Sequence, residues 1–171
     1  MNQLDVYPNL KACATSDLQP GDIFFFLGSD TNFYGLKTED SGPKSEFVFL
    51  GPDFSGFVKE PSILPWTSEI VLSMEKSYRL DLPVELAAWS TSPQRQPAVV
   101  LALVEGRFFV RANGRAGSGF FFPCFIEFGT GKIIEGTLGT GKAAYTPSWG
   151  ISLPGPHQAS TRILSFGGRT D

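Results

Sequence analysis

The stretch EGTLGTGKAAY, residues 135–145, contains the spacing of a nucleotide-binding phosphate loop. Gly136, Gly141 and Lys142 stand where that loop has its two glycines and its lysine. In such a loop backbone N–H groups wrap the phosphates, a helix begins after the lysine, and a Ser or Thr hydroxyl reaches the metal ion. Here Ala143 replaces the hydroxyl residue, and Pro147 follows too soon for a helix to develop. The surroundings therefore argue against a nucleotide site and predict no cofactor.

The tetrapeptide GTGK occurs twice, at residues 129–132 and 139–142. Because glycine supplies the positive φ that tight hairpin turns need, two turns separated by one strand explain the repeat. The exposed amides of the second turn, together with Lys142, remain a candidate site for a small anion. Arg111 and Arg115, which belong to a series that recurs every four residues, are further candidates for an anion contact.

Glu127 and Glu135 flank the first GTGK turn and could form the carboxylate pair of a weak hydrolase. A three-residue turn would bring the two side chains to one face of the sheet as diagonal neighbours. A turn of two or four residues would place them on opposite faces. Surface glutamates are the simpler interpretation.

Cys124 and the single histidine, His157, could in principle form a nucleophilic dyad. However, Cys124 lies within FFFPCFIEF, where a buried and unreactive thiol is expected. His157 lies in the Pro- and Gly-containing stretch LPGPHQAS, which is typical of an exposed loop. Two cysteines and one histidine are too few for a structural zinc site, so we expect no metal.

The segment LQPGDIFFF, residues 18–26, resembles the turn and strand that follow the nucleophilic cysteine in NlpC/P60-type cysteine peptidases. In those enzymes a helix separates the cysteine from this turn. Here Cys13 lies too close to Pro20 for that helix, and no histidine precedes residue 157. We therefore do not expect this chain to share that catalytic site.

Aromatic side chains give a further candidate site. A sugar or other small ligand could stack on two or more of the large aromatic residues, although core packing explains them equally well. These candidate ligand-binding residues are Trp66, Trp89, Tyr145 and Trp149.

The composition predicts an all-β protein. The chain has 171 residues, with 16 Phe, 19 Gly and 13 Pro, a combination that favours many short strands separated by turns. We expect a single domain over residues 17–171, a β-sandwich or barrel of roughly nine or ten strands, preceded by an arm or loose first strand over residues 1–16. Strands are expected at 23–27, 47–50, 98–104, 108–111, 120–128, 132–138, 149–153 and 161–166.

Two predictions concern the middle of the chain. Alternating apolar residues favour a hairpin over residues 68–82 that turns near 75–77, although a capped helix over 68–78 is an alternative. Pro83 and the helix-forming residues after it predict one short helix over 83–89.

The charge and the lack of targeting features bear on the binding partners and the cellular location of the protein. The net charge of −3 does not favour binding to DNA. The N-terminal residues lack a signal-peptide pattern, and no apolar run reaches the roughly 18 residues of a membrane span. We expect a soluble, cytoplasmic protein without membrane insertion, in which Cys13 and Cys124 are free thiols, although one bridge between them is an alternative.

These features favour a non-enzymatic protein-interaction or assembly module. Runs such as IFFFL and GFFFPCFIEF are richer in Phe than a thin core requires, so we expect an apolar, Phe-rich surface that contacts a protein partner or a second copy. The alternative function is a small-ligand or carbohydrate-binding β-barrel, with weak carboxylate chemistry at Glu127 and Glu135.

Overall fold

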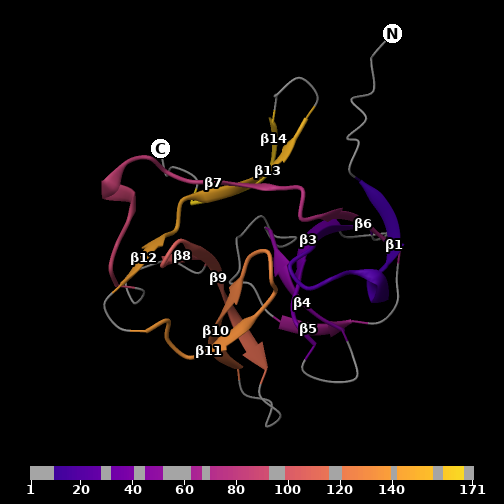
Figure 1. Ribbon diagram of the computed structural model, residues 1–171, viewed down its shortest axis with the longest axis horizontal. Helices are drawn as coiled ribbons and strands as arrows, with labels where there is room; N and C mark the ends of the chain where they lie inside the picture. Colours follow the sequence, from indigo (N-terminus) through magenta and orange to yellow (C-terminus); the bar gives the residue numbers. More distant parts are fainter. Residues whose placement is uncertain are drawn as a thin grey trace.

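A computed structural model describes residues 10–27, 32–40, 45–51, 63–66, 70–92, 99–115, 121–139, 142–155 and 160–167 of the chain. These residues form three antiparallel sheets of six, five and three strands. Figure 1 shows the six-stranded sheet at the right, the five-stranded sheet in the lower centre, and the three-stranded sheet across the top. The all-β prediction is confirmed, and the arrangement is sandwich-like, not a closed barrel.

The six-stranded sheet has the order β1-β6-β2-β3-β4-β5. Its strands are β1 (Lys11–Ala14), β2 (Ile23–Leu27), β3 (Asn32–Lys37), β4 (Ser45–Leu50), β5 (Ile63–Trp66) and β6 (Ile70–Glu75). A 3₁₀ turn, η1 (Thr15–Asp17), connects β1 to the turn that begins β2. Residues 11–14, which the sequence suggested as part of an arm or loose strand, pair with β6 at the edge of this sheet.

The five-stranded sheet has the order β11-β10-β9-β8-β12, and the three-stranded sheet the order β14-β13-β7. The strands of the five-stranded sheet are β8 (Leu101–Val104), β9 (Arg107–Arg115), β10 (Phe121–Glu127), β11 (Ile133–Glu135) and β12 (Ala143–Thr146). The strands of the three-stranded sheet are β7 (Arg79–Asp81), β13 (Trp149–Pro154) and β14 (Ser160–Phe166).

One apolar core joins all three sheets. Strand alternation directs every second side chain inward, so each sheet contributes a row of aliphatic or aromatic residues. Trp149 lies at the contact of the three sheets, stacked on Phe166 at 4.3 Å between ring centroids and edge-on to Phe128 at 5.8 Å. Other core members are Ile23, Leu36, Val48, Leu101, Val110, Ile126, Ile151 and Leu164.

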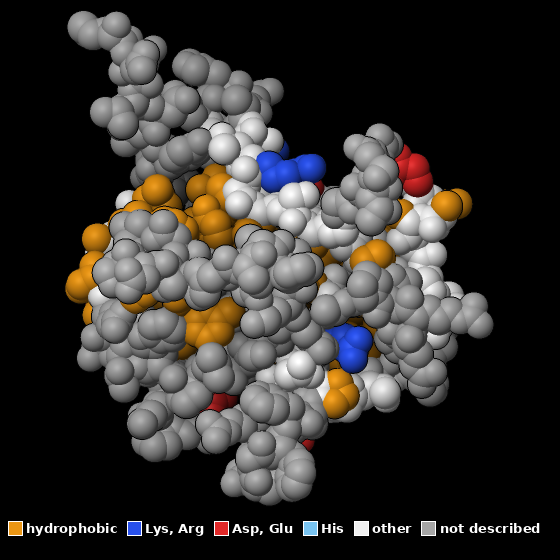
Figure 2. Space-filling view, turned by 180° about the vertical axis from the view of Figure 1, so that it is seen from behind, with side chains coloured by type: hydrophobic (Ala, Val, Ile, Leu, Met, Phe, Trp, Pro, Cys, Tyr) orange, Lys and Arg blue, Asp and Glu red, His pale blue; other side chains and the backbone are white. Residues whose placement is uncertain are grey.

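The opposite face of the six-stranded sheet, which we call the Phe face, carries Phe24, Phe26, Phe33, Phe47 and Phe49. Their rings contact one another at centroid separations of 4.6 to 5.1 Å. The ring of Phe24 lies across the strand on Gly35, where a Cβ atom would be only 2.2 Å from the ring. Figure 2 shows hydrophobic side chains gathered at the left of the view, where the six-stranded sheet lies.

Two expectations for the middle of the chain differ from the structure. A turn does follow Glu75, but β6 and β7 belong to different sheets, so residues 70–81 are not a hairpin. Residues 83–89 contain only a 3₁₀ turn, η2 (Leu86–Ala88), because Glu85 is extended with φ −77° and ψ 124°. Alternating apolar residues predicted the strands but could not reveal that the turn sends the chain from one sheet to another.

Candidate functional site

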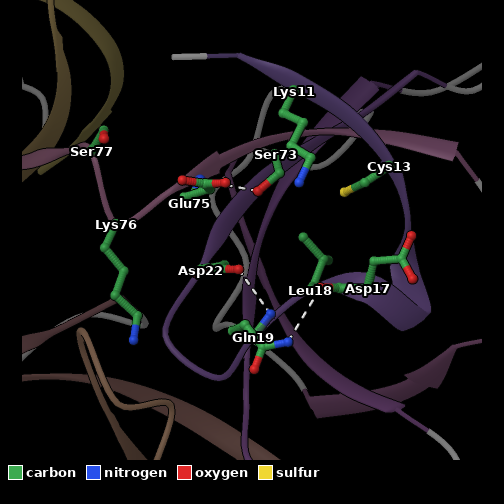
Figure 3. A pocket seen from close by; sticks show the side chains of 10 residues that line it. All are labelled: Lys11, Cys13, Asp17, Leu18, Gln19, Asp22, Ser73, Glu75, Lys76 and Ser77. Carbon is green, nitrogen blue, oxygen red and sulfur yellow. Dashed lines mark hydrogen bonds between the residues drawn. The ribbon is translucent and has the colours of Figure 1, made fainter.

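The described residues line a polar cavity of roughly 600 Å³, open to solvent, beside the β1 edge of the six-stranded sheet. Strand β1, turn η1, the turn before β2 and the end of β6 form its walls (Figure 3). The lining residues are Lys11, Cys13, Asp17, Leu18, Gln19, Asp22, Ser73, Glu75, Lys76 and Ser77. The sequence did not reveal this cavity, because residues 1–16 were expected to be an arm or loose first strand and no candidate site was placed there.

Strand pairing explains which side chains reach the cavity from β1 and β6. Lys11 lies opposite Ser73, and Cys13 lies opposite Val71, so Lys11 and Cys13 project from the same face. Figure 3 shows the Lys11 amine and the Cys13 thiol directed into the same space, whereas Lys76 extends away from both. A lysine and a thiol therefore share one wall of the cavity.

Electrostatics make that thiol a poor nucleophile. Burial raises the pKa of Cys13 above its usual value, and the nearby carboxylate of Asp17 raises it further, while Lys11 acts in the opposite direction. Since the thiolate is the reactive form, the thiol stays protonated at neutral pH. The geometry does not favour nucleophilic catalysis here.

The acidic groups of the cavity support local backbone structure. Asp22 accepts a hydrogen bond from the Gln19 amide at 2.8 Å, and Asp17 accepts one from the Ala14 amide at 3.3 Å. Among the described residues no group of three or more His, Cys, Asp or Glu side chains could hold a metal ion. The cavity can therefore surround a small molecule with charges of both signs, but the described part of the chain offers it no preassembled metal site.

The two GTGK segments have different surroundings. Residues 129–131 of the first segment lie in the turn between β10 and β11, and Gly129 and Gly131 have φ values of 83° and 67°. In the second segment residues 140–141 lie outside the described residues. Lys142 is exposed and is followed directly by β12. A strand in place of a helix after the lysine contradicts the phosphate-loop geometry.

Glu127 and Glu135 lie on opposite faces of the five-stranded sheet. Ile126 pairs with Ile133, so the turn between Glu127 and Lys132 has four residues, 128–131. Glu135 pairs with Cys124, whose side chain lies on the other face of the sheet from that of Glu127. The carboxylate of Glu127 is buried, accepts a hydrogen bond from the Thr130 hydroxyl at 2.9 Å and lies 3.6 Å from Arg107. Glu127 thus stabilises the turn, and the two glutamates do not form a catalytic pair.

The other expected residues do not assemble into one site. Cys124 is fully buried and donates a hydrogen bond to the Ala112 carbonyl at 3.4 Å, whereas His157 lies outside the described residues. Arg111 lies on β9, with β8 between it and Lys142 at the start of β12. The side chain of Arg115, the last residue of β9, lies outside the described part of the molecule.

The four aromatic candidates are also separated. Trp149 is buried in the shared core, and Tyr145 is buried on the opposite face of the five-stranded sheet beside Phe125. The Trp89 indole donates a hydrogen bond to the Pro83 carbonyl at 3.2 Å. The Trp66 side chain lies outside the described part of the molecule, and the described lining of the polar cavity includes none of the four. Core packing and backbone support account for the three described side chains.

A second feature that was not evident from the sequence is an exposed apolar segment between β7 and η2. The side chains of Leu82, Val84 and Leu86 are 36%, 90% and 89% exposed. We define residues 82–86 as the apolar segment. A helix over 83–89, as the sequence predicted, would have directed part of it inward. In Figure 1 it forms the outer bend at the left, between β7 and β12.

Comparisons of the chain with models of protein families, with curated proteins and with solved structures found no match. Among the described residues, no helix has the length and hydropathy needed to cross a membrane.

Proposed function

We propose that this chain is a non-enzymatic protein-interaction or assembly module that binds through its apolar segment. The observation that carries the proposal is the almost complete exposure of Val84 and Leu86 on one short stretch. Large apolar side chains that remain in water next to one another are typical of contact sites, because a partner would remove them from solvent.

The segment is held in place at both ends, which supports this role. Strand β7 anchors it on one side by pairing with β13. On the other side the Trp89 indole binds the Pro83 carbonyl, and Ser90 pairs with Tyr145 of β12 through two backbone hydrogen bonds of 2.7 and 2.8 Å. A preorganised loop loses little conformational entropy when it binds, so more of the contact energy appears as affinity.

The Phe face is a second apolar surface consistent with the same function. Phe24 and Phe47 are buried, and Phe26, Phe33 and Phe49 are half-buried. Because much of their area is already covered, these side chains would contribute less to a new contact than Val84 and Leu86. The Phe face is therefore proposed as an extension of the interface.

The test compares the unchanged chain with a Val84→Ser/Leu86→Ser variant. Both proteins are tagged, expressed in the native host and cross-linked, and the proteins bound to them are quantified by mass spectrometry. An Ile70→Ser variant is the matched control, since Ile70 is 68% exposed at the start of β6. We expect specific loss of bound protein, or of self-association, from the double variant alone. Equal recovery from all three proteins would contradict the proposal.

The polar cavity favours a second candidate function, the binding of a small polar ligand. Lys11 on one wall and the carboxylates of Asp17, Asp22 and Glu75 on the others could hold a molecule that carries both an acidic and a basic group. Amino acids are suitable probes in a thermal-shift titration. An increase in melting temperature that Lys11→Gln abolishes would support this function, and the absence of any increase would contradict it.

A further inference from the structure

The apolar segment continues the free edge of a sheet. Among the described residues strand β7 is the last strand of the three-stranded sheet and pairs with β13 alone, on one side. Beyond β7, Glu85 has extended dihedral angles, and Leu82 is expected to be extended because a proline follows it. Residues 79–81 pair with β13, and residues 82–85, which belong to no strand, would continue that edge when a second chain pairs with them.

One hydrogen bond of the segment indicates which of its backbone groups face outward. The Trp89 indole donates to the Pro83 carbonyl, and the next residue, Ser90, pairs with Tyr145 of β12. If the indole approaches from the side of β12, the Pro83 carbonyl is directed toward that side and away from the open edge. Along an extended chain successive residues direct their N–H and C=O groups to opposite sides. The backbone groups of Leu82 and Val84 therefore face the open side, and no described residue binds them.

This edge is complementary to itself. If two copies pair antiparallel about a two-fold axis at Leu82, Arg79 lies opposite Glu85 of the other copy, and Leu80 lies opposite Val84. Arg79 and Glu85 are exposed and of opposite charge, so each cross-strand pair is attractive. Pro83 falls at a position whose N–H is not required for pairing, so its missing donor costs nothing.

Neighbouring registers fit less well. An axis at Val84 would require the Leu86 carbonyl to bind the second copy, but that carbonyl already accepts a hydrogen bond from the Trp89 amide at 3.1 Å. An axis at Leu80 would leave Val84 and Leu86 uncovered. The axis at Leu82 alone uses the free backbone groups, matches the charges and covers Val84.

We propose that a second copy of this chain docks on the β7 edge and apolar segment, antiparallel and centred on Leu82. The proposal rests on the proposed function and names its partner. Because only two short strands would make the contact, we expect a weak dimer that dissociates in the range of about 10 to 100 µM.

The first test measures self-association by sedimentation velocity from roughly 5 to 500 µM. Arg79→Glu and Glu85→Arg each convert two attractive cross-strand pairs into repulsive ones, so each should weaken dimerisation about tenfold. The double variant Arg79→Glu/Glu85→Arg exchanges the charges and should restore it. Glu105→Arg, at the exposed turn between β8 and β9, is the matched control and should change nothing.

The second test locates the axis. In the proposed register residue 82 faces its own counterpart, so Leu82→Cys should form a covalent dimer under mild oxidation. Residue 86 lies opposite Tyr78 of the other copy in this register, so Leu86→Cys should form no disulfide-linked dimer. The unchanged chain controls for Cys13 and Cys124.

A chain that stays monomeric up to about 500 µM would overturn the proposal, as would a charge-exchanged double variant as weak as the single variants. Those results would leave the proposed function intact if Val84→Ser/Leu86→Ser still loses a different partner. If the Val84→Ser/Leu86→Ser variant keeps both its self-association and all of its partners, the proposed function and the proposed dimer are both refuted.

Discussion

Tyr78 accepts a hydrogen bond from the backbone amide of Gly129 at 3.0 Å, although the two residues lie 51 positions apart. The same hydroxyl donates to the Gly21 carbonyl at 3.3 Å. Gly21 in turn lies so close to the first GTGK turn that a Cβ on it would be 2.3 Å from the Gly129 carbonyl carbon. One phenol therefore joins the turn before β2 to the turn between β10 and β11, and so connects the two large sheets.

Tyr78→Phe should lower the free energy of unfolding by about 1 to 3 kcal/mol. The substitution keeps the ring but leaves the Gly129 amide and the Gly21 carbonyl without a partner in a partly buried place. Urea denaturation followed by tryptophan fluorescence measures the change. Tyr145→Phe is the control, since Tyr145 is buried but the described residues offer its hydroxyl no hydrogen bond. Equal losses from the two variants would contradict the bridging role.

Stability should fall in alkaline solution because of the same residue. Burial raises the pKa of Tyr78 from 10 to about 12, so folding favours the neutral phenol. A group whose pKa is raised by folding contributes its full stability below the unfolded pKa and loses it as the pH rises through the folded one. Between pH 10 and 12 the protein should lose up to about 2 kcal/mol.

The measurement is a series of urea denaturations between pH 8 and pH 12. Tyr78→Phe is the internal control, because it lacks the titrating group and should show a shallower alkaline decline than the unchanged chain. If the two proteins decline in parallel over this range, other groups govern the alkaline loss and the assignment to Tyr78 fails.

The class of fold could be predicted from the sequence because that class depends on local signals. Alternating apolar residues and glycine turns placed β2, β10, β13 and β14 close to their observed positions, whereas β9 extends to Arg115, four residues beyond the predicted strand over 108–111. Which strands share a sheet could not be predicted in the same way. The turn after Glu75 looks the same whether the next strand folds back on β6 or joins β13, and only packing of distant residues decides between them.

The sites were predicted less well for a related reason. The cavity brings together Lys11, Asp22 and Glu75, which are distant in the sequence and carry no motif. The sequence did not reveal the apolar segment, because Leu86 and its neighbours have a high helix propensity and predicted a helix. In the structure the contacts of Trp89 and Ser90 hold these residues in another conformation. Whether Glu127 and Glu135 share a face depends on a turn length that only the structure provides.

Gly35→Ala should destabilise the Phe face by about 1 to 3 kcal/mol. The added Cβ would lie 2.2 and 2.5 Å from two ring atoms of Phe24, which is buried and packed edge-on against Phe47, so the ring cannot move without disturbing its neighbours. Thermal denaturation detects the loss. Gly139→Ala is a matched control because no described atom lies within 4 Å of the place its Cβ would occupy, and it should have little effect. A melting temperature unchanged by Gly35→Ala would show that the Phe24 ring packs less tightly than the structure indicates.

The two cysteines should differ in reactivity toward iodoacetamide. Cys124 is fully buried and should react only after unfolding, whereas Cys13 is half-buried and should react in the folded protein, more slowly than a free thiol at neutral pH. The raised pKa of Cys13 has opposing electrostatic contributions from its two neighbours. Asp17→Asn removes a carboxylate that raises this pKa and should shift the pH profile of alkylation downward, while Lys11→Gln should shift it upward. Mass spectrometry of the alkylated peptides resolves the two sites. Shifts in the same direction from both variants would contradict the arrangement of charges around the cavity.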